Sequence, residues 1–149
     1  HEATALKQLR ALCPPEDRSV APRLLAFMKR REVPAGTQLW RQGGVSDHCC
    51  LVSEGLLENR LEEEAGTWEL CNPGCLVGEY HFLNREKRMG TLVAKEASVL
   101  YVLDSAQLEK MKKSDAYLAF VLARIAINYL GMRCHHISNR IWDTRCLPV

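Results

Sequence analysis

The stretch from about Arg31 to Asp104 most constrains the fold of this chain. Within it, short apolar segments alternate with turn residues, and glycines separate most of the segments. The expected strands are Glu32–Pro34, Gln38–Trp40, His48–Ser53, Leu56–Leu61, Thr67–Cys71, Leu76–Val77, Thr91–Lys95 and Ser98–Leu103. Short strands at intervals of about 8–12 residues, separated by turns, predict an all-β sandwich or barrel.

The residues before this stretch have helical spacing. Apolar residues recur every three or four positions in the first helix, which we expect to end at Pro14. A second helix follows, and Ser19 is the residue that we expect to cap it. The predicted helical region covers about residues 3–30.

Helical spacing returns after the strands. Asp104 or Ser105 can accept a hydrogen bond from the first free N–H groups of a helix that runs to about Lys113. Another helix follows and should weaken or end at Gly131. Residues 137–142 are expected to be helical, so the C-terminal helices cover about residues 105–142, and a tail follows. We therefore predict one domain over residues 1–149, with a barrel over about 31–104.

Composition argues against several classes of partner. The formal net charge is only +2, from 20 basic and 18 acidic side chains, so no electrostatic case exists for binding nucleic acid or an anionic membrane. The longest apolar stretch, residues 116–130, contains Arg124 and Asn128 and is too short to span a bilayer. Seven cysteines, an odd number, favour reduced, mostly buried thiols and a cytoplasmic location over a disulfide framework.

Metal and catalytic sites are not predicted. Cys71 and Cys75, together with residues 134–136 (Cys-His-His), fit no standard zinc module. Two histidines in the barrel are too few for a cupin-type metal site. No third group at recognisable spacing orients a cysteine–histidine pair for nucleophilic chemistry. We therefore expect a protein without a cofactor or metal that is not an enzyme.

Two segments carry a resemblance to a known family. The first reads VPAGTQLWRQG over residues 33–43 and is followed by LVSEG over residues 51–55. The second reads PGCLVGEYHFL over residues 73–83 and is followed by RMGT over residues 88–91. Together they resemble the cyclic-nucleotide-binding domains of cAMP-dependent kinases, cAMP-responsive bacterial regulators and gated channels, over roughly residues 20–130.

The resemblance implies an eight-stranded jelly-roll β-barrel with N-terminal helices and C-terminal helices that act as a lid. It also implies a ligand-binding cassette between the sixth and seventh strands for a cyclic nucleotide such as cAMP or cGMP, or a similar anionic small molecule. In the family a glutamate accepts a hydrogen bond from the ribose and an arginine pairs with the phosphate, which implies these roles for Glu79 and Arg88. The implied ligand-binding residues are Gly78, Glu79, Tyr80, His81, Arg88, Met89, Gly90 and Thr91.

The cassette departs from the family pattern at two places. His81 stands where the family often has alanine, and Lys87-Arg88-Met89-Gly90 replaces a motif such as Pro-Arg-Ala-Ala. His81 and Met89 could fill the phosphate space, or Met89 could turn outward. Protonated His81 or Lys87 could instead add positive charge.

Two hypotheses follow from this interpretation. The domain is a regulatory sensor whose ligand repositions the C-terminal helices, or it keeps the fold with a self-filled pocket and serves as an interaction or autoregulatory module. In either case other domains of a parent protein are expected partners through the C-terminal helices. A weaker likeness, to the C-terminal cytosolic domain of fungal SulP-type anion transporters, implies a membrane protein as that parent.

Overall fold

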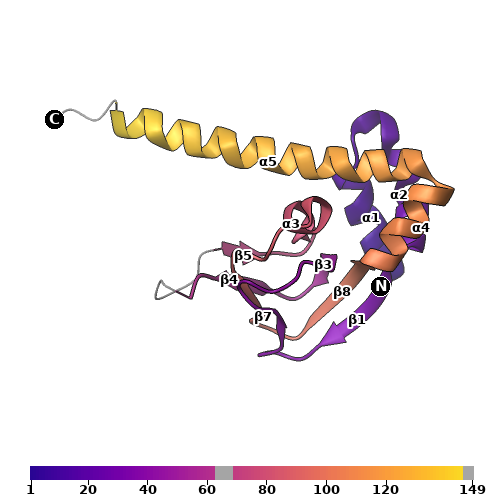
Figure 1. Cartoon of the computed structure of the whole chain (residues 1–149), viewed down its shortest axis with the longest axis horizontal. Helices are drawn as coiled ribbons and strands as arrows, with labels where there is room; N and C mark the ends of the chain where they lie inside the picture. Colours follow the sequence, from indigo (N-terminus) through magenta and orange to yellow (C-terminus); the bar gives the residue numbers. More distant parts are fainter. Residues whose placement is uncertain (63–68, 146–149) are drawn as a thin grey trace.

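The computed structural model describes the backbone of residues 1–62 and 69–145, and their side chains as far as Met132. Along the described chain, N-terminal helices precede eight strands with one short helix among them, and two longer helices follow (Figure 1). The predicted mainly β fold with flanking helices is therefore confirmed. The predicted tail over residues 146–149 and most of the acidic turn after Glu62 lie outside the described residues.

The N-terminal helical region ends earlier than predicted. Helix α1 spans Glu2–Leu12, the 3₁₀ helix η1 spans Pro15–Val20, and α2 spans Ala21–Ala26. Strand β1 begins at Lys29, inside the predicted helical region. Ser19 lies within η1 and makes no cap, because the region before α2 is already helical. The Pro14-Pro15 pair does stop α1 as expected, since proline cannot continue the hydrogen-bond ladder.

The strands form two four-stranded antiparallel sheets, in the orders β1-β8-β3-β6 and β2-β7-β4-β5. Their bounds are β1 Lys29–Val33, β2 Gln38–Trp40, β3 His48–Glu54, β4 Leu57–Arg60, β5 Glu69–Cys71, β6 Leu76–Val77, β7 Thr91–Ala94 and β8 Ser98–Asp104. The two sheets pack face to face as a jelly roll. They are not closed into the predicted barrel, because no ladder joins the sheets within the described residues and the edge strands β2, β5 and β6 have only two or three residues.

Strand β3 is buried on both faces and separates two apolar cores. Cys49 and Leu51 belong to the core between the first sheet and the helices, whereas Cys50 and Val52 belong to the core between the two sheets. This division follows from the alternation of side chains along a strand. The helices therefore cover one face of the sheet β1-β8-β3-β6, and the second sheet covers the other.

Two C-terminal helices follow β8. Helix α4 spans Ser105–Ser114, and its predicted cap is confirmed, because the Asp104 side chain accepts a hydrogen bond from the backbone N–H of Gln107 at 2.8 Å. Helix α5 spans Ala116–Arg145 without interruption, so the predicted weakening at Gly131 is wrong. A single glycine costs only about 1 kcal/mol relative to alanine, which helix-forming neighbours can offset.

Helix α5 passes over the short helix α3 (Glu79–Asn84) and continues beyond the sheets, while α1, α2 and α4 gather at the other end of the molecule (Figure 1). Within the described part of the chain, no helix has the length and apolar character needed to cross a membrane.

Candidate functional site

The cassette connects β6 to β7 and contains seven of the eight predicted ligand-binding residues, whereas the eighth, Thr91, is the first residue of β7. Gly78 has a φ of +80° and precedes the first turn of α3. The helix ends at Arg85, whose φ of +56° is also left-handed. A tight glycine turn is therefore followed directly by a short helix.

No side chain larger than that of glycine fits at position 78. A Cβ atom added to Gly78 would lie 2.5 Å from Trp40 Cη2 and 2.5 Å from Arg88 Nη1. The backbone of the cassette thus lies directly against an indole ring from β2 and a guanidinium from its own far end. This packing, together with the positive φ, explains the requirement for glycine.

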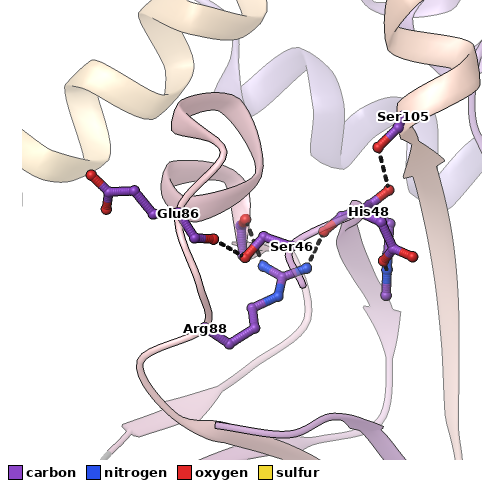
Figure 2. A network of polar contacts seen from close by, with 7 residues as sticks. Ser46, His48, Glu86, Arg88 and Ser105 are labelled. Carbon is purple, nitrogen blue, oxygen red and sulfur yellow. Dashed lines mark hydrogen bonds and ion pairs between the residues drawn. The ribbon is translucent and has the colours of Figure 1, made fainter. Parts of the chain in front are cut away.

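Arg88 is the central side chain of the cassette, with only 3% of its surface exposed. Its Nη1 donates to the Gly78 carbonyl at 2.9 Å, and its Nη2 donates to the carbonyl of His48. Figure 2 shows the guanidinium held between the cassette and the start of β3. Its central carbon lies 3.6 Å from the Trp40 ring centroid, a cation–π contact. Arg88 therefore points inward, as a phosphate-binding residue must.

The charge of Arg88 is poorly compensated. No carboxylate forms an ion pair with it in the described part of the chain, and its Nε is buried without a hydrogen-bond partner there. Burial lowers the pKa of the Arg88 guanidinium, an effect that the charges of Asp47 and Glu79 partly oppose. A buried charge without an ion-pair partner raises the free energy of the folded protein. An anion beside Arg88 would therefore interact favourably with its charge.

The cavity at the cassette is small, about 50 Å³. The predicted site residues that line it are Gly78, Glu79, Tyr80, His81, Arg88, Met89 and Gly90. Thr91 lies at the start of β7, where its hydroxyl accepts a hydrogen bond from the Gln42 N–H at 3.0 Å. The Met89 side chain is 56% exposed, so it does not fill the phosphate space. Arg88 and Trp40 occupy the interior instead.

Sequence reasoning missed five residues that line this cavity, namely Trp40, Asn59, Glu69, Cys71 and Val77. Trp40 contributes the ring beneath Arg88, and Asn59 of β4 lines the wall beside Gly90. A Cβ at Gly90 would lie 2.4 Å from Asn59 Oδ1, an oxygen that is buried without a hydrogen-bond partner in the described chain. Trp40 lies within the first motif segment, residues 33–43, yet only the packing of the two sheets brings its ring to Gly78.

The loop before β3 connects the cassette to α4. Backbone hydrogen bonds join Arg88 to this loop, from Gly43 N to Arg88 O at 2.8 Å and from Arg88 N to Gly44 O at 3.0 Å. At the end of the loop, the Asp47 carbonyl accepts from both the N–H and the hydroxyl of Ser105 at 3.0 Å. Figure 2 shows this path from Arg88 to the first residue of α4.

The adjacent buried residues Cys49 and Cys50 predict that the stability of the domain depends on pH. Burial raises the pKa of Cys50 from 9.0 to about 12 and that of Cys49 well above 9.0. Above pH 9 the unfolded chain therefore binds fewer protons than the folded chain, and stability falls as the pH rises toward the folded values. Between about pH 8 and pH 10 the wild type should lose about 1.4 kcal/mol more unfolding free energy than Cys50→Ala.

Urea unfolding at the two pH values measures this difference, and the Cys50→Ala protein carries every other titrating group unchanged. Equal losses of unfolding free energy in the two proteins would contradict the raised pKa of Cys50 in the folded protein.

The described side chains contain no group of three residues placed to hold a metal ion. Cys75 is a free thiol, and residues 134–136 lie beyond the described side chains.

A model of the cyclic nucleotide-binding domain family matches residues 30–115, more than half of the chain. The chain belongs to this family. The matched segment begins in β1 and ends between α4 and α5, so it contains both sheets and the whole cassette. The family resemblance predicted from the two motif segments is therefore confirmed. No curated protein sequence matches the chain.

Solved structures share the fold of this cyclic nucleotide-binding domain. A cyclic nucleotide-binding domain from Methylobacillus flagellatus superposes with a TM-score of 0.80 at 18% identity, over 99% of this chain and 85% of that one. The N-terminal domain of a transcriptional regulator from Streptomyces coelicolor has a TM-score of 0.69 at 21% identity, with 87% and 94% coverage. The catabolite activator protein of Thermus thermophilus has a TM-score of 0.69 at 22% identity, with 83% and 57% coverage.

Proposed function

We propose that this domain is a non-enzymatic regulatory sensor whose cassette binds a cyclic nucleotide or a similar anionic small molecule. The observation that carries the proposal is the buried guanidinium of Arg88, which lacks a carboxylate partner within the described chain and faces the family's ligand cassette. A planar guanidinium can pair with a phosphate through two parallel hydrogen bonds. Glu79, which is almost fully buried at the first turn of α3, is the proposed acceptor for a ribose hydroxyl.

Ligand binding requires the cassette to open. Ligand pockets commonly have volumes of about 300–1,000 Å³, whereas this cavity holds about 50 Å³. A phosphate would have to take the place of the Gly78 and His48 carbonyls as partner of Arg88, and the guanidinium would have to leave the Trp40 ring. In the proposed sensor, Arg88 would therefore have to exchange its contacts with Gly78, His48 and Trp40 for contacts with the ligand.

The hydrogen bonds around Arg88 offer a route for the signal. Release of the His48 carbonyl frees the start of β3, and the adjacent Asp47 carbonyl holds the first residue of α4 through Ser105. Movement of this loop would change the attachment of α4, and with it the position of α5. The expected partners, other domains of a parent protein, would detect that movement.

One observation favours the second hypothesis, an interaction module without a ligand. Arg88 already has two hydrogen-bond acceptors and an aromatic ring, so the pocket is filled by the protein's own groups. In that case Arg88 stabilises the fold and the cassette never opens. The two hypotheses make opposite predictions for one binding experiment.

Calorimetric titration with cAMP and with cGMP distinguishes them. The wild-type chain should bind at least one of these nucleotides, and Arg88→Ala should weaken binding by about 100-fold or more, because it removes a buried charge that pairs with phosphate. Arg85→Ala is the matched control, since Arg85 is exposed and close in sequence. Circular dichroism checks that each variant is folded. Absence of binding at millimolar ligand, or equal binding by Arg88→Ala, would remove the sensor proposal.

The identity of the parent protein stays a prediction. None of the structures named above is described as a transporter, so the SulP attribution has no support from them. A cytoplasmic location is likewise an expectation from the cysteine content.

A further inference from the structure

Strand β1 is an open edge of the sheet β1-β8-β3-β6. All five of its residues, Lys29–Val33, pair with β8, and within the described part of the chain no other strand lies beside it. Its first four residues are exposed, and β1 follows the outer margin of the sheets in Figure 1. The outer N–H and C=O groups of such an edge strand can form a ladder with a strand from another chain.

The other edges of the two sheets are less suited to a further strand. Strands β2, β5 and β6 have only two or three residues each, whereas β1 has five. A strand that adds to a sheet edge gains affinity from its main-chain hydrogen bonds, so a longer edge offers more of them. Among the described edge strands, β1 is therefore the best suited to pair with an added strand.

Positive charge is concentrated on β1. Lys29, Arg30 and Arg31 are basic and Glu32 is acidic, so the strand has a formal charge of +2. This charge equals the formal net charge of the whole chain, which is also +2. The residues outside β1 are therefore neutral overall, and the excess of basic side chains belongs to this edge.

The two faces of β1 differ in how their charges are paired. Side chains alternate along a strand, so Arg30 and Glu32 share one face, where Arg30 Nη2 donates to Glu32 Oε1 at 2.7 Å. Lys29 and Arg31 share the other face with Val33, a residue of the core between the two sheets. Neither of these cations forms an ion pair with a carboxylate of residues 1–62 or 69–132. Two basic side chains at alternate positions are thus available to a partner.

The charges on β1 make the edge selective. Charged side chains on an edge strand usually prevent it from pairing with apolar strands of other molecules. Across a strand pair, however, opposite charges that face each other attract, and like charges repel. The same residues that disfavour a neutral or basic strand therefore favour an acidic one, which is how specificity commonly arises.

We propose that β1 binds an extended acidic segment of a partner protein, which adds to the sheet as a fifth strand. Residues directly opposite each other on neighbouring strands have Cβ atoms about 4.5–5.5 Å apart, so carboxylates at two alternate positions of the segment would face Lys29 and Arg31. The segment is expected to have a β-branched residue between them, because such residues are enriched in strands. β1 and β6, the strand that leads into the cassette, are opposite edges of the sheet, and this proposal does not depend on nucleotide binding.

Fluorescence anisotropy of the full chain with a labelled peptide, Thr-Val-Glu-Val-Glu-Val-Thr, tests this proposal. The wild type should bind this acidic peptide. Lys29→Glu and Arg31→Glu should each weaken binding by about 10-fold or more, because each replaces an attraction with a repulsion. Lys113→Glu is the matched control: it makes the same change of charge at an exposed position in the last turn of α4 and should leave the affinity unchanged. Circular dichroism verifies that each variant is folded.

Two methylated peptides test whether the bound segment is a strand. Successive N–H groups of an extended strand point to opposite edges, so methylation of the glutamate nitrogens and methylation of the valine nitrogens remove donors from opposite edges. Both peptides keep the charge of the acidic peptide, and only one of them should lose binding. Equal affinities for the two methylated peptides, no binding of the acidic peptide at millimolar concentration, or binding that Lys29→Glu and Arg31→Glu leave unchanged would each overturn the proposal. Tighter binding of a single-stranded oligonucleotide of equal charge would also overturn it.

Discussion

Replacing Gly78 by alanine is expected to lower the free energy of unfolding by about 2–5 kcal/mol. Two costs combine at this position. A left-handed φ costs a residue with a Cβ about 1–2 kcal/mol, and the new methyl group would lie 2.5 Å from both Trp40 and Arg88. Relief of that overlap requires the ring or the guanidinium to move, and overpacking of this kind costs typically about 1–3 kcal/mol.

Gly74→Ala separates these two costs. Gly74 has a φ of +95°, yet a Cβ added there meets no atom within 4 Å. We therefore expect this control to lose only the backbone cost, about 1–2 kcal/mol. Urea unfolding of the three proteins measures the difference. If Gly78→Ala and Gly74→Ala were equally stable, the close packing of Trp40 and Arg88 against the cassette would be refuted.

Replacing Leu103 by alanine should destabilise the domain by about 2–5 kcal/mol, the range for truncation of a fully buried leucine. Leu103 lies on β8, the strand between β1 and β3, and its side chain is completely buried in the core beneath the helices. The structure around a truncated core residue relaxes only partly, so the change should leave a cavity. The same loss should appear in thermal and in urea unfolding.

The control for this prediction is Leu70→Ala on β5. Leu70 has the same chemistry but is an exposed large apolar residue, so its truncation should cost less than about 1 kcal/mol. A large loss at Leu70, or a small one at Leu103, would mean that the two cores are not arranged as described.

Local sequence patterns predicted helices and strands correctly where the pattern depends on residues that are close in the chain. The alternation of apolar segments and glycine turns predicted the eight strands, and Asp104 predicted the start of α4, because strand alternation and helix capping act over a few residues. The prediction failed at Ser19 and at Gly131. At both positions the residue has only a weak preference for ending or capping a helix, and the helical structure continues through it.

The cassette shows the limit of local reasoning. The family resemblance implied its position between the sixth and seventh strands and the roles of Glu79 and Arg88. It did not predict that Trp40, from a strand in the other sheet, would lie against Gly78 and beneath Arg88. The space inside the cassette depends on how the two sheets pack against each other. The spacing of residues along one segment does not determine that packing.

The amino-acid sequence by itself determined the type and order of the elements, because these depend on contacts between residues close in the chain. Only the tertiary structure decided that the two sheets stay unclosed and that the cassette is occupied by its own arginine and a tryptophan. These features depend on how segments that are distant in sequence pack closely against one another.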